Sequence, residues 1–363
     1  MAGSAVALTT STDLKARSTI VLTALCAAAL FGISTPFAKE LLGEVPPILL
    51  AGLLYLGSGI GLLIARLIRD HGWRSVRMPF AELPWLAGAI AFGGILGPVL
   101  LMFGLNRSSA AAASLLLNLE SVLTAVLAWV VFKENADRRI VVGMLLIVAG
   151  GVVLSWPSDT VSGHDWLGPL AIAGACACWA IDNNLTRQVS ASDPLFIAGS
   201  KGLVAGVVNT ALAIVTGSVF PSANVVAAAM AVGLLGYGVS LVCFVVALRG
   251  LGAARTGAYF STAPFLGAVV AIVFFGDTVS ISFLIAAVFM SVGVWLHLTE
   301  RHVHTHTHEP LAHEHPHIHD EHHRHDHDFP WDGQVPHTHP HRHAPITHRH
   351  PHYPDIHHRH GHT

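Results

Sequence analysis

Long stretches without a single charged residue are the feature that most limits how this chain can fold. Residues 1–300 contain 15 Lys and Arg and 14 Asp and Glu, and these charges are clustered. A helix needs about 20 apolar residues to cross the hydrocarbon core of a bilayer. Most of the uncharged intervals reach that length: 18–38, 45–65, 83–106, 140–158, 166–181, 202–248, 256–276 and 278–299.

These intervals predict an all-α integral membrane protein rather than a soluble enzyme. Only 12% of the whole chain is charged, against about 25% in an ordinary soluble domain. We expect ten transmembrane helices near residues 18–40, 48–68, 84–105, 108–132, 139–156, 167–188, 195–216, 224–248, 253–275 and 279–299.

Basic residues are distributed unequally between the two sides that this topology defines. If the N-terminus is cytoplasmic, fourteen Lys and Arg fall on the inside, and only Lys39 and Arg107 fall on the outside. Basic residues favour the cytoplasmic side of a membrane. We therefore expect a multi-pass protein of the cytoplasmic (inner) membrane with both termini in the cytoplasm.

The two halves of the helical region resemble each other when positions are shifted by 143. The run Ala125–Phe132 then matches Ala268–Phe275, and Glu134 aligns with Asp277. Because each half would hold five helices, the halves would enter the membrane in opposite senses, as in many secondary transporters. We expect a cytoplasmic segment at 1–17, two inverted five-helix repeats at 18–157 and 166–300, and a separate tail at 301–363.

Residues 104–134 and 247–277 are similar to the fourth and ninth helices of the EamA family in the drug/metabolite transporter superfamily. The second segment keeps the family's proline as Pro264, whereas the first has Ser121 there. The resemblance implies a ten-helix carrier for small organic solutes, with a central cavity between its halves. Family members handle amino acids, sugars, nucleotide precursors and drugs, so the resemblance leaves the solute open.

Glu120 is the most informative single residue within the expected spans. It lies 13 residues from both Arg107 and Lys133, near the middle of its helix. A carboxylate facing lipid there would cost at least ~2.5 kcal/mol, so we expect it to face the bundle interior. It could bind a proton or a cationic group and release it when the cavity opens to water. The alternative is a protonated or paired carboxyl that only orients packing.

Other polar residues and prolines interrupt the apolar spans. Lys201 could contact substrate, or its stem could reach back to the membrane interface. Prolines remove backbone hydrogen bonds, so we expect helix breaks at Pro36, Pro98 and Pro264. Our candidates for binding substrate or a coupling ion are Glu120, Asp182, Lys201, Asn118, Asn183 and Tyr259.

Histidines fill the C-terminal tail, which holds 23 of the 26 in the chain. Neutral imidazole suits zinc, nickel, cobalt and copper, so we expect the tail to bind such metals and to be disordered without them. An incidental tail, or one that becomes cationic at low pH, is the alternative. The expected ligands are His302, His304, His306, His308, His313, His315, His317, His319, His337, His339, His341 and His343.

Together these observations predict a secondary transporter that exports small organic metabolites by alternating access and needs no cofactor for transport. The expected partners are a small-molecule substrate, the lipid bilayer and transition-metal ions; we expect no nucleic acid and leave open a homodimer. The alternatives are a divalent metal exporter, for which the tail would collect ions, and a membrane-anchored metal store or sensor. An enzyme is disfavoured because His71, His164 and His297 are isolated in the sequence.

Overall fold

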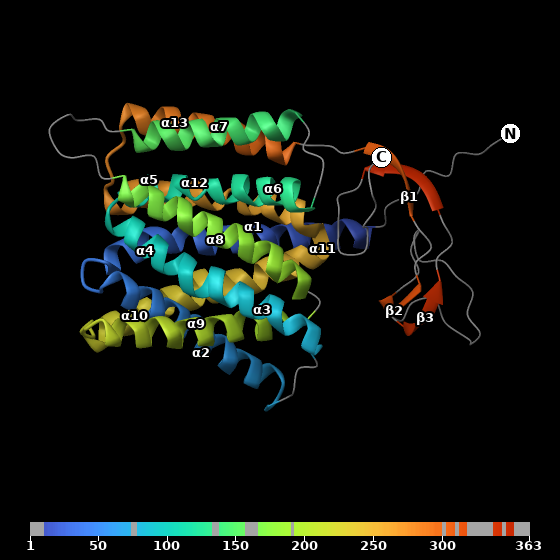
Figure 1. The fold of residues 1–363 in the computed structure, drawn as a ribbon, viewed down its shortest axis with the longest axis horizontal. Helices are drawn as coiled ribbons and strands as arrows, with labels where there is room; N and C mark the ends of the chain where they lie inside the picture. The colour runs from blue at the N-terminus through green and yellow to red at the C-terminus, as the bar shows by residue number, and fades with distance from the viewer. Residues whose placement is uncertain are drawn as a thin grey trace. The chain divides into compact units, whose positions relative to one another are not determined.

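The computed structural model describes residues 11–73, 78–132, 138–156, 166–189 and 192–299, together with four short strands between residues 303 and 351. The chain divides into two compact units at residue 300, and each is described by itself. In the first unit, every regular element of the described ranges is helical (Figure 1).

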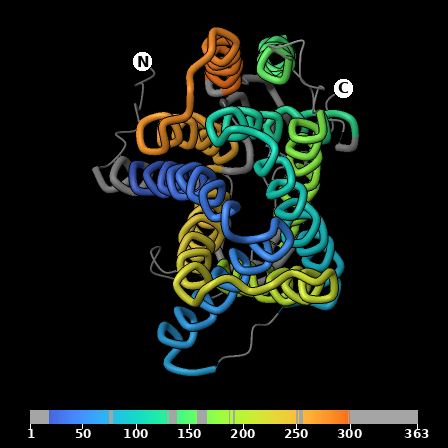
Figure 2. Tube along the Cα trace, turned by 90° about the vertical axis from the view of Figure 1, so that its left-hand side faces the viewer, coloured from blue at the N-terminus to red at the C-terminus, as the bar shows by residue number. Residues whose placement is uncertain are grey.

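The helices of the first unit run roughly alongside one another in Figure 1, and Figure 2 views the two at the top, green and orange, nearly end-on. They are α1 (Ser11–Leu41), α2 (Pro47–Arg69), a 3₁₀ turn (Phe80–Glu82), α3 (Leu83–Ala89), the π-helical η2 (Ile90–Leu96), α4 (Gly97–Asn106), α5 (Ala110–Leu116), α6 (Leu119–Phe132), α7 (Arg138–Ser155), α8 (Leu167–Val189), α9 (Pro194–Val215), α10 (Ala223–Gly233), the π-helical η3 (Leu234–Val239), α11 (Ser240–Phe260), α12 (Ala263–Phe275) and α13 (Ile281–Leu298).

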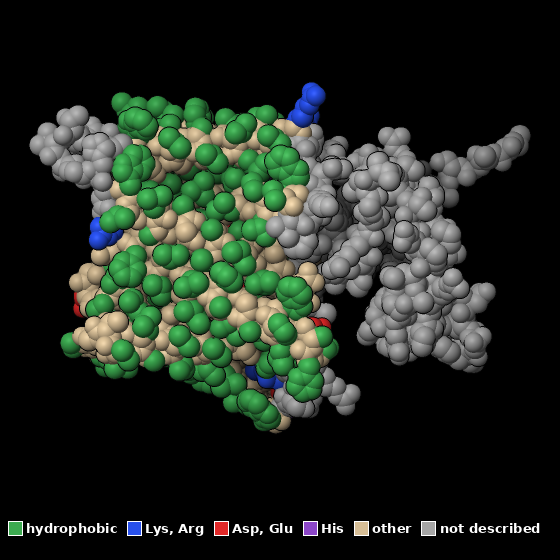
Figure 3. All heavy atoms as spheres, in the orientation of Figure 1, with side chains coloured by type: hydrophobic (Ala, Val, Ile, Leu, Met, Phe, Trp, Pro, Cys, Tyr) green, Lys and Arg blue, Asp and Glu red, His purple; other side chains and the backbone are tan. Residues whose placement is uncertain are grey.

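Eight helices within the described residues are long and apolar enough to cross a membrane, and Ile281–His297 is a shorter apolar helix. The sixth expected span, α8, is not among the eight; it carries the polar residues Asp182, Asn183 and Asn184. In Figure 3, apolar side chains cover most of the visible face of this unit, and charged side chains lie towards its ends. The all-α membrane fold is therefore confirmed, while the count of ten spans stays a prediction.

Two of the expected spans contain a π-helical segment that the sequence pattern did not indicate. In the third span, η2 separates α3 from α4, and the Gly97 amide donates to the Phe92 carbonyl, five residues back. In the eighth, η3 separates α10 from α11, and the Ser240 amide donates to the Leu235 carbonyl in the same way. A π turn changes which carbonyls accept the hydrogen bonds of the helix, and such turns are frequent at functional sites.

The fourth expected span, residues 108–132, is two helices rather than one. Helix α5 ends at Leu116 and α6 begins at Leu119. At this break the Ser121 hydroxyl donates to the Asn118 carbonyl at 2.7 Å, and such local side-chain bonds compete with the backbone bonds of a helix.

The ninth span breaks at the corresponding place. Helix α11 ends at Phe260 and α12 begins at Ala263, with Pro264 in its first turn. The Thr262 hydroxyl donates to the Tyr259 carbonyl at 2.7 Å. A further difference is that α11 continues without interruption through residues 249–252, where we expected the turn between the eighth and ninth spans.

Helices α2 and α9 form one of the closest contacts in the bundle, through glycines. A Cβ atom on Gly59 would lie 2.2 Å from the Leu203 amide nitrogen, and one on Gly202 would lie 2.5 Å from the Gly59 nitrogen. In membranes, small residues allow helices to approach until their backbones are in contact. This contact brings the second helix of the first half against the seventh helix.

The tail contains four strands, β1 (Val303–His308), β2 (Ala312–His317), β3 (His337–Arg342) and β4 (Ile346–Pro351). They form two antiparallel pairs, β1 with β4 and β2 with β3. We expected no regular structure in the tail without metal, so these strands differ from the prediction. The alternation of histidine with other residues has the two-residue period of a strand, which accounts for the difference.

The glycine contact between α2 and α9 makes a stability prediction. Gly59→Ala places a methyl group against backbone, and overpacking of this kind costs about 1–3 kcal/mol. We expect the thermal unfolding midpoint of the purified protein in detergent to fall by several degrees. Gly257→Ala is the matched control, because a Cβ atom there meets nothing within 4 Å; equal midpoints for the two variants would contradict the contact.

Candidate functional site

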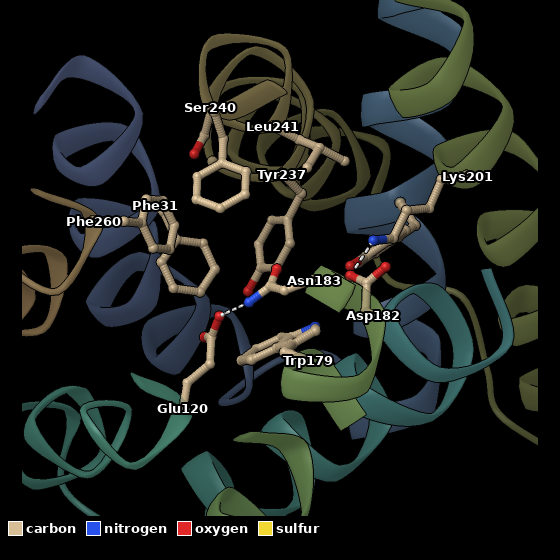
Figure 4. A pocket seen from close by; sticks show the side chains of 13 residues that line it. Phe31, Glu120, Trp179, Asp182, Asn183, Lys201, Tyr237, Ser240, Leu241 and Phe260 are labelled. Carbon is tan, nitrogen blue, oxygen red and sulfur yellow. Dashed lines mark hydrogen bonds and ion pairs between the residues drawn. The ribbon is translucent and has the colours of Figure 1, made fainter. Parts of the chain in front are cut away.

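A pocket in the helical unit encloses about 480 Å³ of empty space, including space open to solvent. Its lining comes from both halves of the chain, and Figure 4 shows these side chains converging on it. The residues that line it are Phe31, Tyr55, Glu120, Trp179, Asp182, Asn183, Lys201, Gly236, Tyr237, Ser240, Leu241, Phe244 and Phe260.

The π-helical segment η2 fixes two aromatic residues of the pocket wall. In an α-helix the Gly97 amide would donate to the Gly93 carbonyl, four residues back. Here it donates to the Phe92 carbonyl instead, so the Gly93 carbonyl does not accept this bond. It accepts hydrogen bonds from the Tyr55 hydroxyl at 2.7 Å and the Trp179 indole at 3.1 Å. Both rings are thereby held in place by backbone within the membrane.

Pro98 leaves a second carbonyl of the same segment in need of a donor. Proline has no amide hydrogen, so the carbonyl four residues earlier, that of Gly94, loses its usual helical partner. The side-chain amide of Asn209 donates to the Gly94 carbonyl at 3.2 Å. Asn209 is fully buried in α9, so this bond ties α9 to η2 beside the pocket.

Glu120 lies in the first turn of α6, just after the break in the fourth span. The N-terminal end of a helix carries partial positive charge and favours a nearby carboxylate. The side-chain amide of Asn183 on α8 donates to Oε1 of Glu120 at 2.8 Å. The break therefore gives a mid-span carboxylate a helix end and a neutral hydrogen-bond donor.

Asp182 and Lys201 form a buried ion pair on another part of the pocket wall. Their side chains are 6% and 4% exposed, and Nζ of Lys201 contacts Oδ2 of Asp182 directly. The hydroxyl of Thr186 donates to the other carboxylate oxygen at 3.0 Å. The Lys201 side chain thus points to α8 in the interior, not back to the membrane interface.

Six aromatic rings of the described residues line the pocket, and Phe31 is in contact with three of the others. Its ring centroid lies 5.7 Å from that of Trp179, 5.8 Å from Tyr237 and 5.3 Å from Phe260. The first two contacts are edge-to-face, an arrangement that aromatic pairs favour. Our sequence reasoning missed this cluster, because aromatic residues are common in apolar helices.

Two of the sequence candidates lie outside the pocket lining. Asn118 is 1% exposed, and its side-chain amide donates to the Leu115 carbonyl at 3.1 Å, in the break between α5 and α6. Tyr259 is half-buried, and its carbonyl accepts from Thr262. The structure brings together Glu120, Asp182, Asn183 and Lys201.

The three candidate prolines occupy different settings. Helix α1 continues through Pro36 to Leu41. Pro98 follows η2 in the first turn of α4, and Pro264 is in the first turn of α12.

At one end of the bundle, charged residues link the first half of the chain to the second. The Arg69 guanidinium at the end of α2 contacts both oxygens of Asp193, at 3.1 and 2.5 Å. Asp193 also caps α9 by accepting from the Leu195 amide at 3.0 Å. The Arg69 guanidinium holds the pKa of the Asp193 carboxyl below its ordinary value.

The opposite end, where α1 finishes, has a second such link. Asp277, just after α12, accepts from the Ala111 amide in the first turn of α5 at 2.7 Å. Lys39 at the end of α1 donates to the Leu105 carbonyl at 2.8 Å. Glu134, the residue of the first half that aligns with Asp277, lies outside the described residues.

No group of three or more His, Cys, Asp or Glu residues that could hold a metal is found among the residues the structure describes. In the tail, the strand register pairs histidine with histidine at five places: His304 with His350, His306 with His348, His313 with His341, His315 with His339, and His317 with His337. Three of the expected ligands, His302, His319 and His343, lie outside the described residues.

Comparison with known proteins connects this architecture to transporters. An uncharacterized transporter of Methanothermobacter thermautotrophicus is 26% identical over 285 residues, which cover 74% of this chain and 83% of that protein. A protein of Pseudomonas aeruginosa named "Probable 4-amino-4-deoxy-L-arabinose-phosphoundecaprenol flippase subunit ArnE" is 38% identical over 115 residues, 30% of this chain and 93% of that protein.

A solved crystal structure shares the fold, with a TM-score of 0.60 and 22% identity, over 77% of this chain and 95% of that one. The family model described as the EamA-like transporter family matches twice, over residues 18–156 and 166–299. The resemblance noted from the sequence is thereby confirmed, and the chain belongs to the EamA-like transporter family of membrane transport proteins.

Proposed function

We propose that this protein is a secondary transporter that exports small organic metabolites by alternating access, with Glu120 at the centre of its cavity. The observation that carries the proposal is the pocket itself. It lies among helices of both halves and has a carboxylate at mid-span. Ionisable residues placed inside a membrane are expensive and usually mark a transport pathway.

An inverted repeat is supported by where the irregular segments fall. The π-helical η2 begins at Ile90 and η3 at Leu234, a separation of 144 residues (234 − 90). Helices α6 and α12, which follow the breaks, begin at Leu119 and Ala263, again 144 apart (263 − 119). The family model also matches the two halves separately. Our inference is that the same two interruptions frame the cavity from both sides.

Alternating access requires that the cavity can close at either end. Arg69 with Asp193 joins the halves at one end, and Asp277 with the α5 amide of Ala111 joins them at the other. Such contacts can be broken and re-formed, as ion pairs are when domains rearrange. We infer that opening one end breaks its link while the other link holds.

Glu120 is the group we propose for coupling. A carboxyl that alternates between a proton and the substrate would release one on binding the other, and its affinity for both would depend on which end of the cavity is open. Asn183 can hydrogen-bond either form, because its amide donates to a carboxylate oxygen and can accept from a carboxyl proton.

An organic solute fits the pocket better than a metal ion does. Six aromatic rings line it, and its carboxylates are divided between two places, with Asp182 committed to Lys201. Divalent metals bind to several converging N, O or S ligands. The ArnE relative is named for the flipping of a lipid-linked amino sugar, which supports an organic solute but does not specify one for this chain.

We propose as a second function that the histidine tail binds transition metals. The five cross-strand histidine pairs favour it, because directly opposed residues in antiparallel strands lie about 4.5–5.5 Å apart at Cβ. Neutral imidazole is a ligand that suits zinc, nickel, cobalt and copper. This capacity is separate from transport and would serve to buffer or sense cytosolic metal.

Glu120→Gln tests the transport proposal. It keeps the size of the side chain but removes its charge and titrating proton, so we expect export of the native solute to fall at least tenfold. The solute would first be identified by comparing metabolite loss from cells with and without the gene. The wild-type rate should depend on pH, and the variant should lose that dependence. Unchanged rate and pH profile at equal protein level would assign Glu120 to packing.

The control for this substitution is Glu44→Gln. Glu44 is exposed in the turn after α1 and does not line the pocket. Its export rate and pH profile should match those of the wild type.

The Asp182–Lys201 pair makes a second prediction, on stability. Lys201→Met leaves a buried carboxylate without its cation, a change that costs about 3–5 kcal/mol. We expect a lower free energy of unfolding in detergent for Lys201→Met, and partial recovery when Asp182→Asn is added. If the double variant were as unstable as the sum of the two single variants, the two side chains would not be coupled.

Deletion of residues 302–363 tests the tail. We expect the purified protein to lose most of its zinc and nickel binding, measured by calorimetry, while it stays folded and transports solute. A full-length variant with Asn at the ten paired histidines should lose the tightest sites and keep weaker ones. Loss of transport by the deletion under metal-free conditions would show instead that the tail belongs to the transport mechanism.

A further inference from the structure

We propose that the cavity selects monovalent organic cations, specifically an amine carried on a flat apolar body. This inference rests on the proposed transport function and adds the chemical class of the solute. Two independent observations carry it: the charge balance of the pocket lining and the dominance of aromatic rings in it.

Among the described charged side chains of the pocket lining, the carboxylate of Glu120 has no cation of its own. Among the residues that the structure describes, three charged side chains line the pocket: Glu120, Asp182 and Lys201. Lys201 is held by Asp182 in a direct ion pair. Within the part of the chain that the structure describes, the partner of Glu120 is the neutral amide of Asn183, and no Lys or Arg is paired with it. A cationic ligand would supply the missing positive charge.

The aromatic lining suits an organic cation more than a hydrated one. Ring faces attract ammonium groups and also pack against flat apolar bodies. Phe31, Trp179 and Tyr237 line the same pocket as Glu120, and Figure 4 shows the Glu120 carboxylate pointing to Asn183 on the side where these rings lie. An amine could therefore meet the carboxylate while its body lies among the rings.

Other solute classes fit this lining less well. A phosphate or carboxylate would meet Glu120 and Asp182. Lys201, the one cation among the described residues that line the pocket, is already paired. A sugar would need many free hydrogen-bonding groups, whereas the Tyr55, Trp179 and Ser240 donors of the lining are already bonded to backbone carbonyls. A zwitterionic amino acid would satisfy Glu120 with its amine but would leave its carboxylate without a free cation.

A set of four probes with one benzene ring tests this class directly. Phenethylamine is cationic, phenethyl alcohol neutral, 3-phenylpropionate anionic and phenylalanine zwitterionic. Binding to the purified full-length wild-type protein in nanodiscs would be measured by calorimetry at pH 8. We expect phenethylamine to bind at least tenfold more tightly than the other three. Equal or tighter binding of the anion, the alcohol or the zwitterion would overturn the proposal.

Two variants test whether the amine binds at the Glu120 carboxylate and the aromatic rings. Glu120→Gln should weaken the binding of phenethylamine at least tenfold and change the affinity for phenethyl alcohol by less than threefold. Phe31→Leu keeps an apolar side chain but removes a ring face, and should weaken the amine more than the alcohol. Glu44→Gln, in the exposed turn, should leave all affinities unchanged. Amine binding that is equally tight in Glu120→Gln would show that the cation lies elsewhere, and would contradict the inference.

The binding experiment does not depend on transport, so the two proposals can fail separately. Selective, Glu120-dependent amine binding without any amine flux in proteoliposomes would leave this inference standing and overturn the transport proposal. Export of an anionic or uncharged metabolite by the wild type, lost in Glu120→Gln, would keep the transport proposal and overturn this inference.

Discussion

Inside a bilayer every polar group must find its partner in the protein, because the hydrocarbon offers none. The central region of this transporter is organised around that requirement. A π-helical turn and Pro98 release the carbonyls of Gly93 and Gly94 from the helical pattern. Side chains of α2, α8 and α9 donate to these carbonyls in place of backbone amides. The irregular backbone of one helix thus determines where three others contribute to the cavity wall.

The same requirement explains the position of the acidic residue. A carboxylate at mid-span is tolerable only where the protein supplies compensating polarity. The interruption between α5 and α6 supplies it, since it creates a helix N-terminus beside Glu120, and Asn183 adds a hydrogen bond from the neighbouring α8. In one continuous helix, Glu120 would have no helix end beside it.

Apolar intervals of bilayer length were enough to predict the membrane fold, and the expense of a buried charge was enough to predict that Glu120 faces inward. For Lys201 the sequence left two positions open, the interior and the membrane interface, and the ion pair with Asp182 places it in the interior. The partners of these residues were not predictable, because Asn183 meets Glu120 only through the packing of α8 against α6. The π-helical segments and the aromatic cluster were missed for a related reason: Phe31 and Tyr237 look like any other apolar helix residues until tertiary contacts bring them together.

A π turn is, in effect, one extra residue accommodated in a helix. Each residue of an α-helix advances about 100° around the axis, so shifting the extra residue along the chain rotates every side chain that it passes by roughly that angle, without unwinding the helix. Tyr237 lies within η3, and its ring packs against those of Phe31 and Tyr55. Moving this turn along the helix would turn a side chain towards the places that Gly236 and Gly238 occupy, where a Cβ atom would lie 2.3 Å from the Ser34 Cβ and 3.1 Å from the Ser58 Oγ. The close packing of η3 against α1 and α2 therefore fixes the position of the π turn and, with it, the direction of the Tyr237 ring.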